Sequence, residues 1–361
     1  MRSGLHRRSC HRQIRLGGLA GTRDPPLNGF MYLIYFEEPY GLLSIGVRGR
    51  LPLYSPPMSL IVTGTIGIDT VHTPTGKAEG VSGGSCAYFA AAASLLTKVR
   101  IVAAVGGDWP EEHRQILNSF ENICLEGLET RPDSKTFAWG GRYLDDMNQR
   151  ETLYTNLGVV EEAPPKIPDK YKDSEYIFLA NTHPTVQMEL LSHFPKRKLA
   201  VADTMDLWIN IARDELVALL AKVDGLALNY EEAEQLTDQS NPVSAARKIL
   251  EMGPSFVTVK KGEHGAILVH QDGVAVLPAY PLSLEYVVDP TGAGDSFAGG
   301  FMGYLASKDK TDFQSIQTAL AWGTITASFT IEAFGLERLR NLTIDDINDR
   351  LKRFQAAARV G

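Results

Sequence analysis

The chain has 361 residues, of which 44% are apolar and 22% charged, an ordinary balance for one large globular domain or two smaller ones. Its net charge of −7 argues against a general affinity for nucleic acid or anionic membranes, and no apolar run is long enough to predict a transmembrane helix. Three widely spaced cysteines without a Cys-x-x-Cys motif argue against a disulfide framework or a zinc site. We therefore expect a cytoplasmic protein that binds neither nucleic acid nor membranes.

Residues 1–57 differ in composition from the rest of the chain. They contain eight Arg, no Lys and three acidic residues, and they show little periodicity. Three interpretations remain open: translation that truly starts at Met58, a targeting peptide, or a disordered tail. We predict that the folded domain spans residues 58–361.

Short β-branched runs alternate with amphipathic or Ala-rich stretches along this domain. The predicted strands are Leu60–Thr63, Arg100–Val105, Tyr176–Ala180, Lys198–Ala202, Gly225–Leu228, Ser255–Lys260 and Ala266–His270. The predicted helices are Ser85–Leu96, Glu111–Asn122, Arg213–Lys222, Pro242–Met252, Ala293–Ala306 and Phe313–Ile331. This alternation predicts the α/β class, with a three-layer α/β/α, doubly wound and mostly parallel sheet. Ligands of such a sheet bind at the carboxyl ends of its strands.

One segment departs from this alternation. Thr136–Tyr143 and Arg150–Asn156 are predicted to be two antiparallel strands joined by a polar turn. A hairpin inserted into an α/β chain is either an edge hairpin or a lid over the active site. Both interpretations stay open on this pattern alone.

Upstream of the C-terminal helices lie two further segments that carry polar groups. Asn229 and Glu232 follow the predicted strand Gly225–Leu228, and together they suit a magnesium ion bound through water. The alternative is an N-cap that begins the next helix. The turn 261–265 joins two strands, and its glycines would let the backbone approach a nucleotide.

The most informative motif is Asp289-Pro290-Thr291-Gly292-Ala293-Gly294-Asp295, which follows a predicted short strand at Glu285–Val288 and opens a helix. The first N–H groups of a helix lack intrahelical partners and carry partial positive charge, so they can bind a phosphate. Gly292 and Gly294 permit the tight turn that such an anion hole needs. Asp295 is then either a helix-stabilising charge or a general base beside the anion.

The order and spacing of Asn-x-x-Glu, Lys-Gly-x-x-Gly and Asp-Pro-Thr-Gly-Ala-Gly-Asp resemble the ribokinase-like, or PfkB-type, carbohydrate and nucleoside kinase family. The resemblance covers Ser59 to Phe354, and three N-terminal features also match it: the turn that ends at Asp69, the pair Gly83-Gly84 and the pair Gly107-Asp108. The chain contains no Gly-x-x-x-x-Gly-Lys-Ser/Thr motif, which excludes a P-loop kinase.

The resemblance implies a ribokinase-like fold with a small β lid, and phosphoryl transfer from ATP to a hydroxyl of a sugar or nucleoside. Asp295 would be the general base, and the N–H groups of Gly292, Ala293, Gly294 and Asp295 would stabilise the transferring phosphoryl group. Glu232 would hold Mg²⁺ through water, and Asp289 and Thr291 occupy the positions of a K⁺ site in many relatives. The implied nucleotide-binding residues are Asn229, Lys261, Gly262, Gly265, Phe334 and Gly335, with the helix Phe313–Ile331 also walling the adenine.

The substrate-binding residues that the resemblance implies are Asp69, Gly83, Gly84, Tyr88, Arg142 and Asn181. The Asp69 carboxylate would accept two hydrogen bonds from a vicinal diol. Tyr88 stands near the place where a typical ribokinase has the amide that grips a small sugar, which disfavours plain ribose. Its ring would either stack on a sugar or base or pack within its helix.

On this resemblance the hairpin is the lid. Its candidate ligand-facing residues are Trp139, Arg142 and Tyr143, which cannot all point inward without a bulge at Gly140-Gly141. The lid would also form a homodimer. The alternatives are a kinase specific for a nucleoside such as inosine, adenosine or cytidine, or a non-catalytic sugar-binding regulator. A vitamin or hydroxymethylpyrimidine kinase conflicts with the predicted lid.

Overall fold

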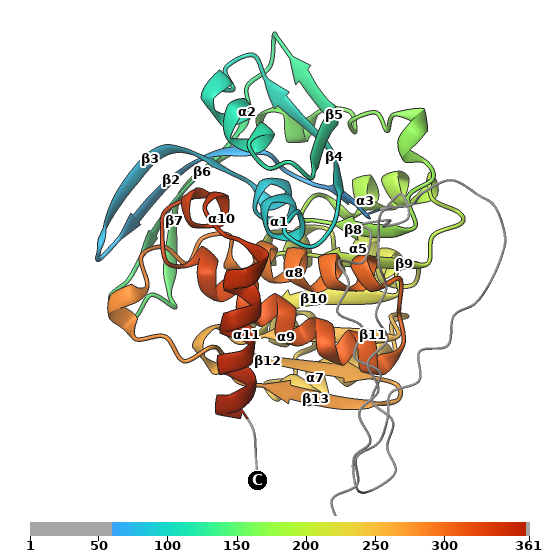
Figure 1. Cartoon of the computed structure of the whole chain (residues 1–361). Helices are drawn as coiled ribbons and strands as arrows, with labels where there is room; N and C mark the ends of the chain where they lie inside the picture. The colour runs from blue at the N-terminus through green and yellow to red at the C-terminus, as the bar shows by residue number, and fades with distance from the viewer. Residues whose placement is uncertain (1–59, 359–361) are drawn as a thin grey trace, which may run out of the picture. The chain divides into compact units, whose positions relative to one another are not determined.

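The computed structural model describes residues 60–358, so the predicted extension 1–57 lies outside the described residues. Within that part, one sheet has the strand order β13-β12-β11-β10-β9-β8-β1-β4-β5 (Figure 1). The strands are β1 Leu60–Thr63, β4 Val99–Gly106, β5 Ile123–Arg131, β8 Tyr176–Leu179, β9 Leu199–Asp203, β10 Gly225–Asn229, β11 Phe256–Lys260, β12 Ala266–His270 and β13 Gly273–Leu277. Pairing is parallel from β5 to β11, and β12 and β13 are antiparallel additions.

Alternate side chains of these strands point to opposite faces of the sheet and pack into two hydrophobic cores, one on each face. Val62, Phe178 and Val201 pack into one core, whereas Ile61, Leu179 and Ala202 pack into the other. The first core is covered by α1 Ser85–Ala93, α8 Ala293–Lys308, α9 Phe313–Thr330 and α11 Ile344–Ala358. The second core is covered by α3 Pro184–Ser192, α5 Arg213–Leu220, α6 Tyr230–Thr237 and α7 Pro242–Leu250. The predicted three-layer α/β/α class is confirmed.

The remaining helices are short. They are α2 Glu111–Asn118, α4 Asp206–Ile211 and α10 Glu337–Arg340, with 3₁₀ turns at Gly158–Glu161, Asp169–Tyr171, Gly262–His264 and Leu284–Tyr286. None of the helices in residues 60–358 combines the length and apolar character that crossing a membrane requires.

A second sheet, which we call the lid sheet, has the strand order β3-β2-β6-β7 and lies at the left of Figure 1. Its strands are β2 Gly67–Thr73, β3 Gly76–Gly83, β6 Phe137–Tyr143 and β7 Arg150–Asn156. The hairpin β6–β7 is where the sequence predicted it, with a register shift between Gly140 and Gly141. The sequence analysis did not predict β2 and β3, which double the width of the lid sheet.

The β6–β7 hairpin of the lid sheet is anchored to the end of β4 through Thr136, the residue before β6. Asp108, which follows β4, accepts hydrogen bonds from the N–H (2.8 Å) and Oγ1 (2.9 Å) of Thr136. Thr136 Oγ1 in turn accepts the N–H of Gly106 at 2.9 Å. The Gly107-Asp108 pair therefore fixes the point at which the chain enters the lid.

The predicted strand at Glu285–Val288 is wrong. Leu284–Tyr286 forms a 3₁₀ turn, and the N–H groups of Val288 (2.8 Å) and Asp289 (3.2 Å) both donate to the carbonyl of Ile331. The end of α9 thus supplies the hydrogen bonds that a neighbouring strand would have supplied. The glycine motif is attached to α9 rather than to a sheet.

Candidate active site

Charged and polar side chains gather at one edge of the main sheet. Asp203, Asn229 and Lys260 are the last residues of β9, β10 and β11, which are neighbours in the strand order. The carboxyl ends of parallel strands meet at one edge, so these three side chains lie together. The sequence analysis placed Asn229 here but assigned no role to Asp203 or Lys260.

The glycine motif turns sharply into α8. Gly292 is the N-cap, with a φ of +74° that a side chain rarely adopts, and a Cβ on it would lie 2.3 Å from ring carbons of Tyr88. Ala293 N–H donates to Pro290 O at 3.2 Å, and the regular helical bonds begin with Ser296 N–H to Gly292 O at 2.8 Å. The N–H groups of Gly294 and Asp295 precede that first helical bond, as the predicted anion hole requires.

Asp295 is half-buried in the first turn of α8. Burial, followed by the charge of Asp203, raises the pKa of its carboxyl to about 7, whereas Lys260 and Arg150 act to lower it. A carboxyl that titrates near neutral pH is suited to accept a proton during a reaction.

Asn229 and Glu232 form a capping box at the start of α6. Asn229 Oδ1 accepts the N–H of Glu232, and Glu232 Oε2 accepts the N–H of Asn229, both at 2.8 Å. Burial, followed by Asp203, raises the pKa of Glu232 to about 8. The structure therefore shows that Asn229 and Glu232 cap α6, and a role of Glu232 in holding Mg²⁺ stays a prediction.

The turn from Lys261 to Gly265 borders the same edge of the sheet. Gly262 and Gly265 have φ values of +54° and +82°, and a Cβ on Gly265 would lie 2.1 Å from the carbonyl of Leu277. The tip of the lid sheet reaches this turn, because Asn148 Nδ2 donates to Glu263 Oε1 at 3.2 Å. The predicted nucleotide loop and the lid therefore meet.

Asp69 lies in β2 of the lid sheet, facing the di-glycine. It is 3% exposed, and a Cβ on Gly83 would lie 1.9 Å from its Oδ2, so only glycine fits there. The backbone of Gly84 (φ +91°) hydrogen-bonds the carboxyl, while Oδ1 is buried without a partner. Burial raises the pKa of Asp69 to about 7, with smaller contributions from Asp289 and Asp295. The predicted acceptor carboxylate and the predicted base are thus close enough to repel each other.

Two tyrosines contact the glycine motif. Tyr88 is 1% exposed, its ring packs on Gly292, and its hydroxyl is buried without a partner. Tyr143 of the lid sheet accepts a hydrogen bond from Thr291 Oγ1 at 3.3 Å. The ring of Tyr88 is therefore used in packing, and only its hydroxyl is left to face a ligand.

Four predicted residues have other contacts. Arg142 is exposed and lies 4.0 Å from Glu151 on the neighbouring lid strand. Asn181 accepts a hydrogen bond from Trp208 Nε1 at 2.7 Å and donates to the sulfur of Met205 at 2.9 Å. Phe334 packs with lid residues in a small cluster, and Gly335 follows it next to β3. The structure does not bring these side chains together with Asp69 and Asp295.

Arg150 is a lid residue that the sequence analysis missed. It pairs with Tyr143 in the β6–β7 register, and its guanidinium lies 5.5 Å from the centre of the Trp139 ring. Its positive charge acts on Asp295 and Glu232, lowering the pKa of both carboxyls. The lid thus brings a cation towards a site rich in carboxylates.

Asp289 is the other buried carboxylate of the motif. It is 1% exposed, its Oδ1 accepts the N–H of Thr291 at 2.8 Å, and its Oδ2 is buried without a partner. Burial raises the pKa of its carboxyl. An unpartnered buried oxygen fits the predicted monovalent cation at Asp289 and Thr291.

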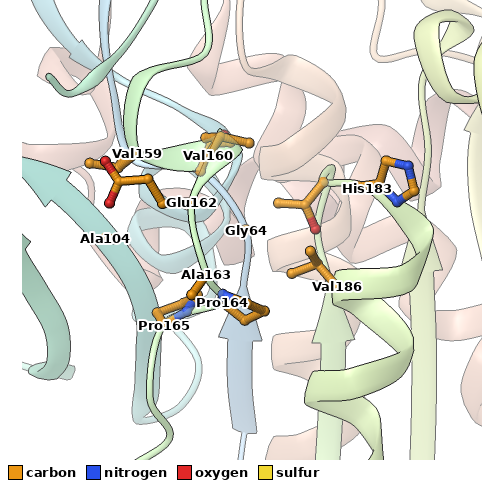
Figure 2. A pocket seen from close by; sticks show the side chains of 12 residues that line it. Gly64, Ala104, Val159, Val160, Glu162, Ala163, Pro164, Pro165, His183 and Val186 are labelled. Atoms are coloured by element: carbon orange, nitrogen blue, oxygen red, sulfur yellow. The ribbon is translucent and has the colours of Figure 1, made fainter. Parts of the chain in front are cut away.

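A narrow cavity of about 30 Å³ lies beyond the carboxyl end of β1. Figure 2 shows Val159 and Val160 on one side of it and His183 and Val186 of α3 on the other. This volume admits only one or a few water molecules. A sugar or nucleoside therefore cannot bind within this cavity alone.

Comparisons with known proteins agree with this geometry. Residues 70–342 match the model of the pfkB family of carbohydrate kinases. A cytidine kinase of Thermococcus kodakarensis is 32% identical over 252 residues, which cover 68% of this chain and 87% of that one. A nucleoside kinase of Methanothermobacter thermautotrophicus is 28% identical over 287 residues, covering 78% and 86%. The solved nucleoside kinase of Methanocaldococcus jannaschii, an archaeal member of the ribokinase family, superposes with a TM-score of 0.66 at 21% identity, covering 82% of this chain and 99% of that one. The chain has a ribokinase-like fold, and it is a kinase that belongs to the pfkB family of carbohydrate kinases.

Proposed function

We propose that this kinase transfers the γ-phosphoryl group of ATP to the primary hydroxyl of a nucleoside. The observation that carries the proposal is the placement of Asp69, buried in the lid sheet, near Asp295 in the first turn of α8: burial is the main cause of the raised pKa of Asp69, and the charges of Asp289 and Asp295 add to it. One carboxylate can hold the acceptor by its diol while the other takes the proton of the reacting hydroxyl.

The acceptor end of the site favours a nucleoside over a small free sugar. Asp69 Oδ1 and the Tyr88 hydroxyl are buried without partners, so a ribose diol could satisfy both. Trp139 of the lid sheet is only partly buried and could cover a nucleobase. The similarity to a cytidine kinase and to a nucleoside kinase supports the same choice.

In the proposed reaction the acceptor oxygen attacks the γ-phosphorus, and the bond to the β-phosphate oxygen breaks to release ADP. The proton of the hydroxyl passes to the carboxylate of Asp295. The N–H groups of Gly294 and Asp295, with those of Gly292 and Ala293, stabilise charge on the phosphoryl oxygens. Lys261, Gly262 and Gly265 would border the nucleotide next to Asn229.

Magnesium would be held by Glu232 through water. In residues 60–358, no group of three His, Cys, Asp or Glu side chains is arranged to ligate a metal directly. The carboxyls of Asp203, Glu232 and Asp295 nevertheless all have raised pKa values, because burial disfavours their charges and because the charge of Asp203 adds to the shifts of Glu232 and Asp295. A hydrated Mg²⁺ that arrives with ATP would relieve this repulsion and neutralise charge on the phosphates.

The test is ATP consumption by the full chain against a panel of acceptors, with ³¹P NMR identification of the product. The panel includes cytidine, inosine, adenosine, guanosine, ribose and fructose. We expect kcat/KM for at least one nucleoside to exceed that for every free sugar by about 100-fold or more. A free sugar as the best acceptor would replace the nucleoside proposal with a sugar kinase. Nucleoside binding without turnover would favour the non-catalytic regulator instead.

A further inference from the structure

Lys260 and Asp203 form an ion pair that reaches across the end of β10. Lys260 Nζ lies 3.8 Å from Asp203 Oδ2, and only 16% and 8% of the two side chains are exposed. This distance is too long for a hydrogen bond. The ammonium is therefore attracted to Asp203 without committing its N–H donors to it, so they remain available to a third group.

The ammonium lies directly beside the start of α8. A Cβ on Gly294 would be 3.1 Å from Lys260 Nζ, which is the closest atom to that position. Gly294 has no positive φ, unlike Gly292, so backbone conformation does not explain a glycine inside this helix. The space that a side chain would occupy is instead used by the ammonium group of Lys260.

The charges around the Lys260 ammonium keep it protonated, so it can bind an anion. Burial acts to lower the pKa of the Lys260 ammonium, but the charges of Asp203, Glu232 and Asp295 together outweigh it and raise the pKa. Lys260 is therefore protonated at neutral pH. It stands next to the Gly294 and Asp295 N–H groups, which precede the first regular hydrogen bond of the helix. A phosphate bound by those N–H groups would lie within reach of the ammonium.

We propose that Lys260 donates to the γ-phosphate of ATP and stays in contact with the phosphoryl group during its transfer, while Asp203 positions the ammonium. This inference rests on the proposed function, because it assigns a further catalytic residue to that reaction. Lys260 keeps its proton throughout, since the hydroxyl proton goes to Asp295. Its contribution is electrostatic and should grow as charge shifts between the acceptor and ADP oxygens.

The test compares nucleotides that differ by one phosphate. The full chain, Lys260→Met and a matched control, Lys222→Met at an exposed lysine after α5, are titrated with ADP and with a non-hydrolysable ATP analogue. We expect Lys260→Met to bind the analogue about 10- to 100-fold more weakly and ADP within about threefold of wild type. With a productive acceptor, kcat should fall by about 100-fold or more. Lys222→Met should match wild type in every measurement.

Two further variants keep the outcome interpretable if Lys260→Met is unstable. Lys260→Arg keeps the charge and should retain most of the preference for the analogue over ADP. Asp203→Asn should lower kcat by about 5- to 20-fold while ADP affinity changes little. If Lys260→Met weakens the binding of ADP and of the analogue equally, or weakens neither, the assignment is overturned. Because the binding ratio needs no acceptor, it can support Lys260 even if the nucleoside proposal fails, and the acceptor panel can succeed even if Lys260 has no effect.

Discussion

The two halves of the site are built in opposite ways. On the proposed phosphoryl side, Asp203 is buried at a strand end, Glu232 is buried in the first turn of α6, and Asp295 is half-buried in the first turn of α8. On the acceptor side, Asp69 is buried in the lid sheet, but every residue of β7 is exposed. The carboxylates that we propose act on the phosphoryl group lie at a strand end of the main sheet and in the first turns of helices packed against it, whereas the proposed acceptor carboxylate lies in the four-stranded lid sheet.

A small apolar cluster and several hydrogen bonds link the lid sheet to the residues around the glycine motif and the turn 261–265. The hydrogen bonds include Thr291 Oγ1 to Tyr143 (3.3 Å), Thr75 Oγ1 to Val288 O (3.1 Å) and Asn148 to Glu263 (3.2 Å). Each such hydrogen bond contributes only about 1 kcal/mol, so the loss of any one of them should have a small effect. Substitutions on the two sides should therefore differ in size and in the kinetic constant that they change.

Apart from removal of the proposed base, the largest effect should come from Gly292→Ala. The added Cβ would lie 2.3 Å from the Tyr88 ring and would force a strained φ, so the anion hole should lose its shape. We expect kcat to fall by about 100-fold or more. The control is Gly80→Ala, which has a similar φ of +67° but no atom within 4 Å of the new Cβ. Similar losses in both variants would show that backbone strain alone explains the result.

Asp69→Asn should impair use of the acceptor while leaving ATP binding nearly unchanged. We expect kcat/KM for the acceptor to fall by about 100-fold, since a neutral amide cannot accept two hydrogen bonds from a diol as strongly. The KM for ATP should stay within about threefold. An equal loss for both substrates would place Asp69 on the phosphoryl side.

The same variant should gain stability in a pH-dependent way. The pKa of Asp69 rises to about 7 in the folded chain from 3.8, so the folded state favours the protonated carboxyl and loses stability as pH rises between those values. Asp69→Asn removes this loss, by about 4 kcal/mol at pH 8 and by well under 1 kcal/mol near pH 4. Thermal melting at both pH values measures the difference. A lower Tm than wild type at pH 8 would contradict it.

A smaller effect is expected on the pH profile, because the charge of Arg150 in the lid sheet acts on Asp295 in α8. Because Asp295 must be ionised to accept a proton, kcat/KM should fall about tenfold for each pH unit below about 7. The lid residue Arg150 lowers the pKa of Asp295, so Arg150→Gln should move this profile to higher pH, by roughly one unit or less. A shift to lower pH, or none, would mean that the lid does not bring Arg150 near the base.

The smallest expected effect is that of Asn148→Ala at the lid tip. Loss of its hydrogen bond to Glu263 should raise the acceptor KM by about two- to threefold, because the closed lid becomes less populated. Asp145→Ala, an exposed position in the same turn, should leave the KM unchanged. Equal effects of the two variants would make the turn, rather than this contact, responsible.

The sequence located the elements around Asn229 and Asp295 better than the strands β2 and β3 for a physical reason. Asn229 and Glu232 follow a buried run that local pattern identifies as a parallel strand, and the glycine motif is one contiguous run that opens a helix. The strands β2 and β3 are rich in glycine and polar residues and depend on pairing with β6, which local pattern does not reveal.

The roles of Lys260 and Arg150 could not be predicted from the sequence, because they depend on where a side chain points and on strand register. Lys260 and Lys261 are adjacent at the end of β11, and only the structure shows which one lies against Gly294. Arg150 reaches the site because it pairs with Tyr143 across the hairpin, after a register shift at Gly140-Gly141. The strand predicted at Glu285–Val288 failed because its hydrogen-bond partner, Ile331, lies at the distant end of α9.

The central claim is that Asp295 is the base of a phosphoryl transfer, and Asp295→Asn tests it most directly. Turnover with the best acceptor and ADP affinity by calorimetry are measured on the same preparation. We predict that kcat falls by about 1,000-fold or more while ADP affinity stays within about threefold, because the amide cannot accept the proton but still fits the first turn of α8. Turnover at the wild-type rate with an unchanged pH profile would contradict the account.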